Sequence, residues 1–278
     1  MKSRSIFILT LVVLLTIPFY GYGDQWQDLI EQKDKGVINW TKGIVQATGI
    51  GAPPEKFYGK PNARPLALRA AKLDAYRNIL EVINGVRINS ATVVKDFAVE
   101  NDVIMSKVEG MVKGAEVVKK EYLSDGTVEI TIQMNLQGGF AQLILPEDIK
   151  PLESIKSVMP PQSSSAVYTG LVVDARGLKT RPAMSPKVLD ENGQEVYGSA
   201  FVSREYAVQQ GMSGYAKDLA AAQGNQRVTD NPLTVKGLRA EGAGRSDIVI
   251  SNADASRLRS ASENLSFMKK CRVMIVVD

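Results

Sequence analysis

Hydrophobic residues in the first half of the chain recur with helical spacing in two segments, which we predict to be amphipathic helices. In the first segment, apolar residues stand three or four positions apart: Leu66, Ala70, Leu73, Tyr76, Leu80 and Ile83. Pro65 suits the first turn of this helix, and Asn84-Gly85 ends it. The second helix is expected from an N-cap at Asn101 to a stop at Gly114. We expect the apolar stripe of the first helix to pack on a β-sheet.

Other segments of the same half have the pattern of β-strands. Val37–Gly49 is rich in β-branched residues and is predicted to be one strand. From Val128 to Leu136, apolar residues alternate with polar ones, and the turn sequence Ser124–Gly126 separates this run from a preceding strand-like run. This pattern is typical of a hairpin with one buried face. The first domain is therefore expected to be α+β, with two helices covering an antiparallel sheet.

The second half of the chain predicts another α+β domain. Val167–Ala175 is apolar at consecutive positions, which indicates an interior strand. A hairpin is expected to join Lys187–Asp190 to Gln194–Tyr197 across Asn192-Gly193. Further strands are expected at Leu233–Arg239, Asp247–Ser251 and Cys271–Val277, and helices at Tyr215–Gln223 and from a cap at Asn252 toward Glu263. We therefore predict two α+β domains, each with helices packed on a mainly antiparallel sheet.

Two segments are predicted to lie outside these domains. Residues 1–23 have the pattern of a secretory signal peptide, because Lys2 and Arg4 precede the apolar run Ile6–Tyr20 and small residues follow it. Cleavage is expected before Asp24, and an uncleaved membrane anchor is the alternative. Residues 150–165 contain three prolines and a run of serines, which is typical of an extended linker. The domains are accordingly expected at residues 24–149 and 166–278.

Charge and cysteine content narrow the classes of function. Removal of the signal peptide takes away two cations and no acid, so the formal net charge falls from +4 to +2. Basic residues occur in pairs rather than in blocks with aromatic residues, so no nucleic-acid partner is expected. Cys271 is the only cysteine, so no lipid-modified cysteine follows the signal peptide and no direct lipid anchor is expected. Its apolar surroundings favour a buried, inert thiol.

The chain has no histidine, which excludes Ser/His and Cys/His catalysis and histidine metal sites. The short glycine clusters match no phosphate-binding motif and are interpreted as turns: Gly49, Gly51, Gly242 and Gly244. Asp190–Asn192 lacks the spacing of a calcium loop, and a hairpin turn explains it. No catalytic residue, cofactor or metal is predicted.

One group of residues is predicted to bind a ligand. Asp174 follows an apparent interior strand with Arg176 beside it, which is where carboxylate chemistry would be sought, although a satisfied turn aspartate is the alternative. Asp174, Arg176 and Arg181 are the candidate site for a glycan, a peptidoglycan fragment or a small ligand. A carboxylate-based hydrolase is a further alternative, and it would need two acids facing across a pocket.

Two segments of the first domain carry a resemblance: RPLALRAAKLDAYRNILEVINGVRI and VKDFAVENDVIMSKVEGMVKGAEVVKKEYLSDGTVEITIQMNL. Their alanine-rich helix, the Asn84-Gly85 stop, the Lys107–Gly114 stretch and the Ser-Asp-Gly hairpin resemble the lipoprotein-20 family of bacterial envelope proteins over Pro61–Leu136. That family includes outer-membrane lipoproteins and flagellar accessory proteins that form discs or rings around the motor. The resemblance implies an assembly role and no enzyme activity. The missing lipid-bearing cysteine sets this chain apart from the lipoprotein members.

The sequence thus predicts an exported structural or assembly protein of the cell envelope. Its expected location is the periplasm, with outer-membrane association only through partners. The expected partners are further copies of the chain and envelope or flagellar proteins, which sheet edges and the helix surface would contact. The alternative is a periplasmic binding module that uses the Asp174 region.

Overall fold

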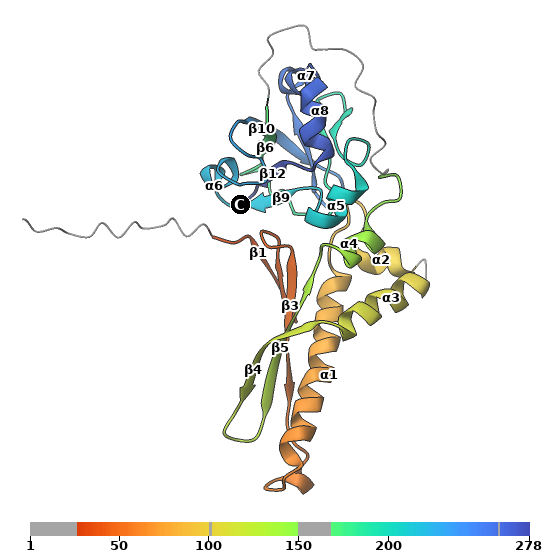
Figure 1. Ribbon diagram of the computed structural model, residues 1–278, viewed down its shortest axis with the longest axis vertical. Helices are drawn as coiled ribbons and strands as arrows, with labels where there is room; N and C mark the ends of the chain where they lie inside the picture. The colour runs from red at the N-terminus through yellow and green to blue at the C-terminus, as the bar shows by residue number, and fades with distance from the viewer. Residues whose placement is uncertain (1–26, 100–101, 150–167, 261) are drawn as a thin grey trace, which may run out of the picture.

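The computed structural model describes residues 27–99, 102–149, 168–260 and 262–278, and it shows a protein of two α+β domains (Figure 1). The expected signal peptide and linker lie outside these ranges, as does the expected N-cap Asn101. The first domain is elongated along one long helix, and the second domain lies at one end of it (Figure 1). The predicted two-domain α+β class is confirmed. Among the described helices, none combines the length and apolar composition that a membrane span requires.

The first domain contains an antiparallel sheet of five strands in the order β1-β2-β3-β5-β4. The strands are β1 (Ile30–Lys33), β2 (Gly36–Asn39), β3 (Ile44–Gly51), β4 (Glu116–Tyr122) and β5 (Val128–Asn135). The helices are η1 (Glu55–Phe57), α1 (Ala63–Asn84), α2 (Val94–Val99), α3 (Asp102–Lys113) and α4 (Gly139–Ile144). Helix α1 lies along one face of the sheet, chiefly over β3 and β5 (Figure 1).

The predicted helix at Pro65–Ile83 is confirmed as α1, but only part of its predicted stripe packs on the core: Ile83 is buried, and Tyr76 and Leu80 are partly buried against it. The buried positions are three alanines followed by three larger aliphatic residues: Ala67, Ala71, Ala75, Ile79, Val82 and Ile83. Leu73 of the expected stripe is 51% exposed. The predicted residues recur with the same helical period on an overlapping face, so periodicity alone did not identify the alanine positions that are fully buried.

Strand β3 explains why alanines occupy three of the buried positions of α1. A Cβ atom at Gly49 would lie 2.0 Å from the backbone nitrogen of Ala75, and one at Gly51 would lie 2.3 Å from that of Ala71. Glycine on the strand and alanine on the helix therefore let the two backbones approach closely. The interpretation of Gly49 and Gly51 as turn residues is wrong.

The segment Val37–Gly49 forms two strands instead of the predicted one. The chain reverses between β2 and β3, where the Lys42 N–H donates to Asn39 Oδ1 at 3.0 Å and Gly43 has a φ of 65°. A glycine tolerates this left-handed backbone without strain. The reversal places Trp40 at the end of the sheet that faces the second domain.

The predicted hairpin at Ser124–Gly126 is confirmed by the pairing of β4 with β5. Val128, Ile130 and Ile132 are buried on the side of α1, and the residues between them are partly exposed. Strand β4 lies at the edge of the sheet, and all seven of its residues are exposed. The sheet is therefore open on one face and at one edge in the described part of the chain.

The second domain contains a mixed sheet of seven strands in the order β8-β7-β11-β10-β6-β12-β9. The strands are β6 (Gly170–Asp174), β7 (Val188–Leu189), β8 (Glu195–Tyr197), β9 (Gly214–Ala216), β10 (Pro232–Glu241), β11 (Asp247–Ile250) and β12 (Val273–Val276). The helices are α5 (Arg204–Gln210), α6 (Leu219–Gln223), α7 (Asn252–Arg259) and α8 (Ser262–Lys269). Gly242 and Gly244 lie in the turn between β10 and β11, as predicted.

The expectation of a mainly antiparallel second sheet is wrong. Strand β6 pairs in parallel with β10 and β12, β12 with β9, and β11 with β7, whereas only the β10–β11 and β7–β8 pairs are antiparallel. Alternation along one strand reveals burial but not the direction of its partner, because pairing direction depends on how the connections cross the sheet. The predicted interior strand is confirmed, since β6 lies between β10 and β12.

Two helix starts in the second domain differ from the prediction. The segment Tyr215–Gln223 begins as strand β9, and its helix starts only after Asp218, which caps it by accepting the Ala221 N–H. Helix α7 is capped by Ser251, not by Asn252, because the Ser251 hydroxyl accepts the Asp254 N–H at 3.1 Å. Neighbouring Ser, Asn and Asp residues are all competent caps, so sequence does not choose among them.

Replacement of Gly49 by Ala tests the close contact between α1 and β3. We expect Gly49→Ala to lower the free energy of unfolding by about 2–3 kcal/mol, because the added methyl group must displace backbone. Gly110→Ala in α3 is the matched control, since a Cβ there meets nothing within 4 Å; it should be neutral or stabilising by up to about 1 kcal/mol. Urea unfolding measures both, and equal stabilities of the two variants would contradict the contact.

Candidate functional site

The three residues predicted to bind a ligand do not form one site. Asp174 stands at the end of β6 and accepts two hydrogen bonds from the Arg176 side chain, at 2.8 and 2.7 Å. Arg181 lies instead at the boundary between the domains, where its Nη2 is 3.9 Å from Glu31 Oε1. Arg181 lines a cavity, whereas Asp174 and Arg176 line none of the cavities described below.

Asp174 has the character of a satisfied turn aspartate. Hydrogen bonding by Arg176 lowers the pKa of the Asp174 carboxyl, although burial opposes the shift. The backbone N–H of Arg176 also donates to Asp174 Oδ1, at 3.3 Å. These partners lie in the turn that follows β6, so the pair holds the local backbone. This geometry favours the turn interpretation over carboxylate catalysis.

The boundary between the domains is organised around the buried side chain of Arg87, which is 4% exposed. Its guanidinium donates Nη1 and Nη2 to the two carboxylate oxygens of Glu31, at 3.0 and 2.5 Å. Its Nε donates to the Pro182 carbonyl of the second domain at 2.6 Å. One side chain therefore ties β1, the segment after α1 and the second domain together.

Glu31 receives further donors that complete this arrangement. Trp40 Nε1 donates to Glu31 Oε2 at 2.8 Å, and Lys33 Nζ lies 2.8 Å from Glu31 Oε1. Burial raises the pKa of the Glu31 carboxyl, but the hydrogen bonds from Arg87, Lys33 and Trp40 outweigh burial and hold the pKa at about 2. Glu31 is therefore ionised at all ordinary pH values.

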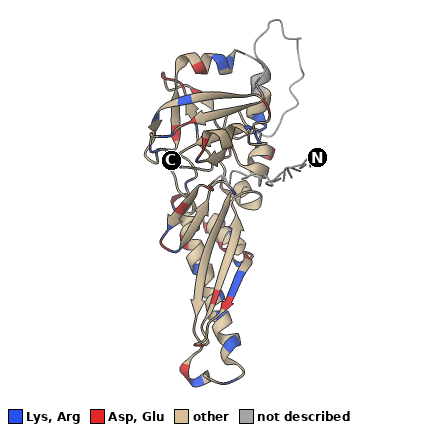
Figure 2. Ribbon diagram, turned by 90° about the vertical axis from the view of Figure 1, so that its left-hand side faces the viewer, with Lys and Arg blue, Asp and Glu red and all other residues tan. Residues whose placement is uncertain are grey.

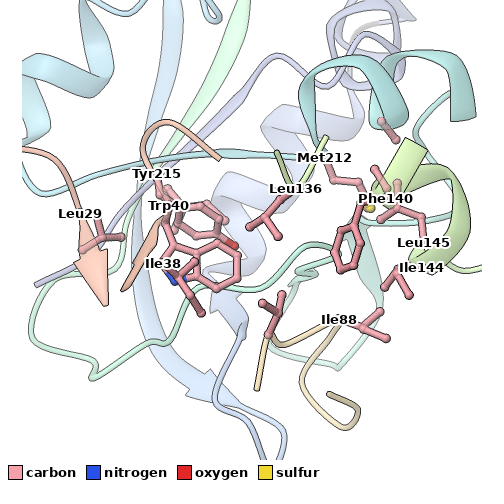
Figure 3. Close-up of a cluster of buried hydrophobic side chains, with 14 of the residues drawn as sticks. Leu29, Ile38, Trp40, Ile88, Leu136, Phe140, Ile144, Leu145, Met212 and Tyr215 are labelled. Carbon is pink, nitrogen blue, oxygen red and sulfur yellow. The ribbon is translucent and has the colours of Figure 1, made fainter. Parts of the chain in front are cut away.

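Aromatic packing continues the boundary beside this ion pair. The rings of Trp40 and Tyr215 meet edge to face, with their centroids 5.8 Å apart. Figure 3 shows the two side chains next to each other. The Arg87 guanidinium lies 5.6 Å from the centroid of the Trp40 ring. The Tyr215 hydroxyl donates to the Ala183 carbonyl and accepts the Ala183 N–H, so its polar end is satisfied while its ring is buried.

Backbone hydrogen bonds also cross the boundary. The N–H groups of Met184 and Ser185 donate to the carbonyls of Arg87 and Ile88, at 3.0 and 2.7 Å. The N–H of Gly138 donates to Val208 O at 2.8 Å. Buried apolar residues of both domains belong to one continuous core. The two domains therefore pack as a single unit and not as separate bodies joined by a linker.

The pocket beside Trp40 at the boundary is small and partly open. A cavity of about 40 Å³ lies beside Trp40, Leu136, Ala207 and Tyr215. Such a space holds a few water molecules but no organic ligand. Ser213 Oγ, which also lines it, has no hydrogen-bond partner within the described protein.

Cys271 and Asp190 of the second domain have structural roles. Cys271 is buried, as predicted, and burial raises the pKa of its thiol to about 12, so no reactive thiolate forms near neutral pH. Asp190 Oδ1 accepts the N–H groups of Asn192 and Gln194, which confirms the hairpin-turn interpretation. No cluster of three potential metal ligands occurs among the described residues.

Charged residues are spread over both domains and gather in no single block (Figure 2). The most exposed strand is β4, on which apolar and charged residues stand together. Val118 is 44% exposed and Tyr122 52%, and Leu123 after the strand is 45% exposed. Lys119 and Glu121 form an ion pair within the strand at 2.8 Å. An exposed strand of this kind at a sheet edge is a surface for pairing with another strand.

Comparison with known proteins assigns a relative to the second domain only. Residues 170–278 match a family model described as the second domain of Tp0624 from Treponema pallidum. The matched segment begins with β6 and contains the whole seven-stranded sheet. No curated protein matches the chain. The lipoprotein-20 resemblance of Pro61–Leu136 lies outside the matched segment and stays a prediction.

The residues of the domain boundary were not found from the sequence. Arg87 stands in an apolar stretch after a helix stop, and Glu31 in a short polar segment, and neither belongs to a motif. Arg87 and Glu31 are 56 positions apart along the chain. The one available signal was a lone arginine between the apolar residues Val86 and Ile88, which favours a paired, buried cation.

Substitution of Glu31 tests the ion pair through pH. The pKa of Glu31 is about 2 in the folded protein, below the ordinary value of 4.5. The ionised carboxyl therefore stabilises the fold by about 3 kcal/mol above pH 4.5, and this contribution disappears as pH falls through 2. Glu31→Gln should therefore lower the free energy of unfolding by at least that amount at pH 7. The difference from the wild type should shrink between pH 4.5 and 2, as measured by urea unfolding.

Asp174→Asn is the matched control for this experiment. Its partner Arg176 has a side chain that is 41% exposed, so loss of the pair should cost less than about 1 kcal/mol. A difference between wild type and Glu31→Gln that stayed constant from pH 7 to pH 2 would contradict the role of the Glu31 charge.

Proposed function

We propose that this chain is an exported, non-enzymatic assembly protein of the periplasm, and that it binds a second copy of itself through strand β4. The observation that carries the proposal is that all seven residues of this edge strand are exposed. The lipoprotein-20 resemblance supports an assembly role, and it makes envelope or flagellar proteins the expected further partners. With no lipid-bearing cysteine after the expected signal peptide, any outer-membrane association would depend on these partners.

The hairpin geometry indicates which backbone groups of β4 are available. The Leu123 N–H donates to the Thr127 carbonyl at 2.9 Å, so the Leu123–Thr127 pair is hydrogen-bonded. Backbone groups alternate in direction along an antiparallel strand, so those of Lys120 and Tyr122 point away from β5. They form the open edge to which another strand can add.

The sequence of β4 suits pairing with its own copy. A symmetric antiparallel pair places one residue opposite itself, and a two-fold axis at Lys120 sets Lys119 opposite Glu121 and Val118 opposite Tyr122 of the copy. Each of these contacts occurs twice. The facing Lys120 side chains repel each other, but their length lets the charged ends separate.

The same strand limits association beyond a pair. Two features of β4 are typical of sheet edges that are protected against uncontrolled aggregation. One is the pair of charged residues Lys119 and Lys120, and the other is the irregular pairing with β5 between Val117 and Lys119. Once β4 has paired with a copy, the edge is closed. A disc or ring like those of the resembled family would need a second contact, for which the exposed face of α1 with Leu73 is the expected surface.

Charge reversal tests the proposed pairing. We expect the chain from Asp24 onward to form a dimer, Lys119→Glu or Glu121→Lys to weaken it at least tenfold, and the double variant to restore it. Each single change places like charges opposite each other at positions 119 and 121 of the two copies. The double change swaps the two charges and restores opposite charges at these positions. Light scattering across a concentration series measures the dimer. Since both side chains are exposed, folding should change by less than about 1 kcal/mol.

Arg239→Glu is the control, because Arg239 and Glu241 form a comparable exposed pair on β10. A wild-type chain that stays monomeric, or a double variant as weak as the single ones, would contradict pairing through β4. Removal of the second domain is a poor test, because it would expose the core around Trp40 that both domains share.

A further inference from the structure

A groove lies where the segment after α1 meets the second domain. It has a volume of about 130 Å³, and its lining includes Gly85, Arg87, Asn89, Ser90, Arg181 and Gly244. Gly244 N–H donates to the Ser90 carbonyl at 2.5 Å, which closes one side of the groove. The groove belongs to both domains, and the β4 edge lies elsewhere on the first domain (Figure 1).

Positive charge exceeds negative charge at this groove. Arg87, Lys33 and Arg181 converge on the single carboxylate of Glu31, at 2.5, 2.8 and 3.9 Å. The Lys33 ammonium also lies beside the groove, since a Cβ at Gly85 would be 3.9 Å from its Nζ. Glu31 already accepts hydrogen bonds from Arg87 and Trp40. Of the three cations, Arg181 lies farthest from the carboxylate, so its charge is the least neutralised.

An acid on the opposite side offsets this charge only in part. The Asp247 carboxylate accepts a hydrogen bond from the Ser90 hydroxyl, and its other oxygen accepts the Lys187 N–H at 3.1 Å. Lys187 also lies near Asp247 and is paired with Glu195 at 3.2 Å. Asp247 therefore has its own partners, and Arg181 is left as the cation that faces the groove and solvent.

The backbone holds Arg181 in a fixed place. Its N–H donates to the Arg245 carbonyl at 2.9 Å, and the Arg245 side chain donates to the carbonyls of Lys179 and Leu178. Lys179 and Arg245 both have left-handed backbones, with φ of 54° and 55°. Such conformations in residues other than glycine carry strain and occur often at binding sites. The Arg181 side chain itself is 54% exposed and able to meet a ligand.

We propose that this groove binds the carboxylate or phosphate group of a ligand, with Arg181 as the principal contact. A guanidinium matches the two oxygens of either anion in a bidentate pair. The volume is below the roughly 300 Å³ of an ordinary small-molecule pocket, so the groove holds one anionic group while the rest of the ligand stays outside. The proposal does not depend on pairing through β4.

Titration calorimetry of the full chain with two probes tests this site. Inorganic phosphate represents a phosphate ligand, and an N-acetylated dialanine with a free carboxyl end represents a peptide carboxylate. The same dipeptide with an amide in place of the free carboxyl end is the uncharged control. We expect saturable binding of at least one anion, no binding of the amide, and binding at least tenfold weaker in Arg181→Gln.

Arg239→Gln is the matched variant, because it removes the same charge from a side chain of similar exposure, 50%, on β10. It should bind like the wild type, and the probe that binds identifies the anionic group. Absence of saturable binding of both anions to the wild type at millimolar concentration would overturn the proposal. Equal weakening in Arg181→Gln and Arg239→Gln would overturn it too, since that result indicates general charge attraction.

Discussion

The buried ion pair of Arg87 with Glu31 is the interaction on which the rest of the structure depends. A guanidinium that is 4% exposed is tolerated only where its charge and its donors are matched. Glu31 supplies the charge from β1, Pro182 supplies a carbonyl from the second domain, and Trp40 supplies an aromatic face. Because these groups come from separate parts of the chain, satisfying one cation fixes the arrangement of both domains.

The two proposed surfaces have different physical origins. The β4 edge lies where the sheet extends beyond the cover that α1 provides, so its exposure follows from the shape of the first domain. The groove at Arg181 follows from the junction itself, because three cations meet at one carboxylate. One surface suits a protein strand and the other an anionic group.

Packing between α1 and β3 explains why the first domain is thin and long. Glycine at positions 49 and 51 and alanine on the facing helix bring the backbones close together. A close approach leaves little room for large side chains at the contact, and Leu73 stays at the surface. The period of the helix was readable in the sequence, but its buried face was decided by the strand that it met.

The sequence by itself determined the two α+β domains, helix α1, the β4–β5 and β7–β8 hairpins, the interior strand β6 and the buried thiol of Cys271. Each of these follows from local periodicity, turn residues or composition, which act between near neighbours. Tertiary structure alone decided the parallel pairings of the second sheet, the separation of Arg181 from Asp174 and the partners of Arg87. These depend on contacts between residues far apart in the chain, and such contacts leave no periodic trace in either partner's own segment.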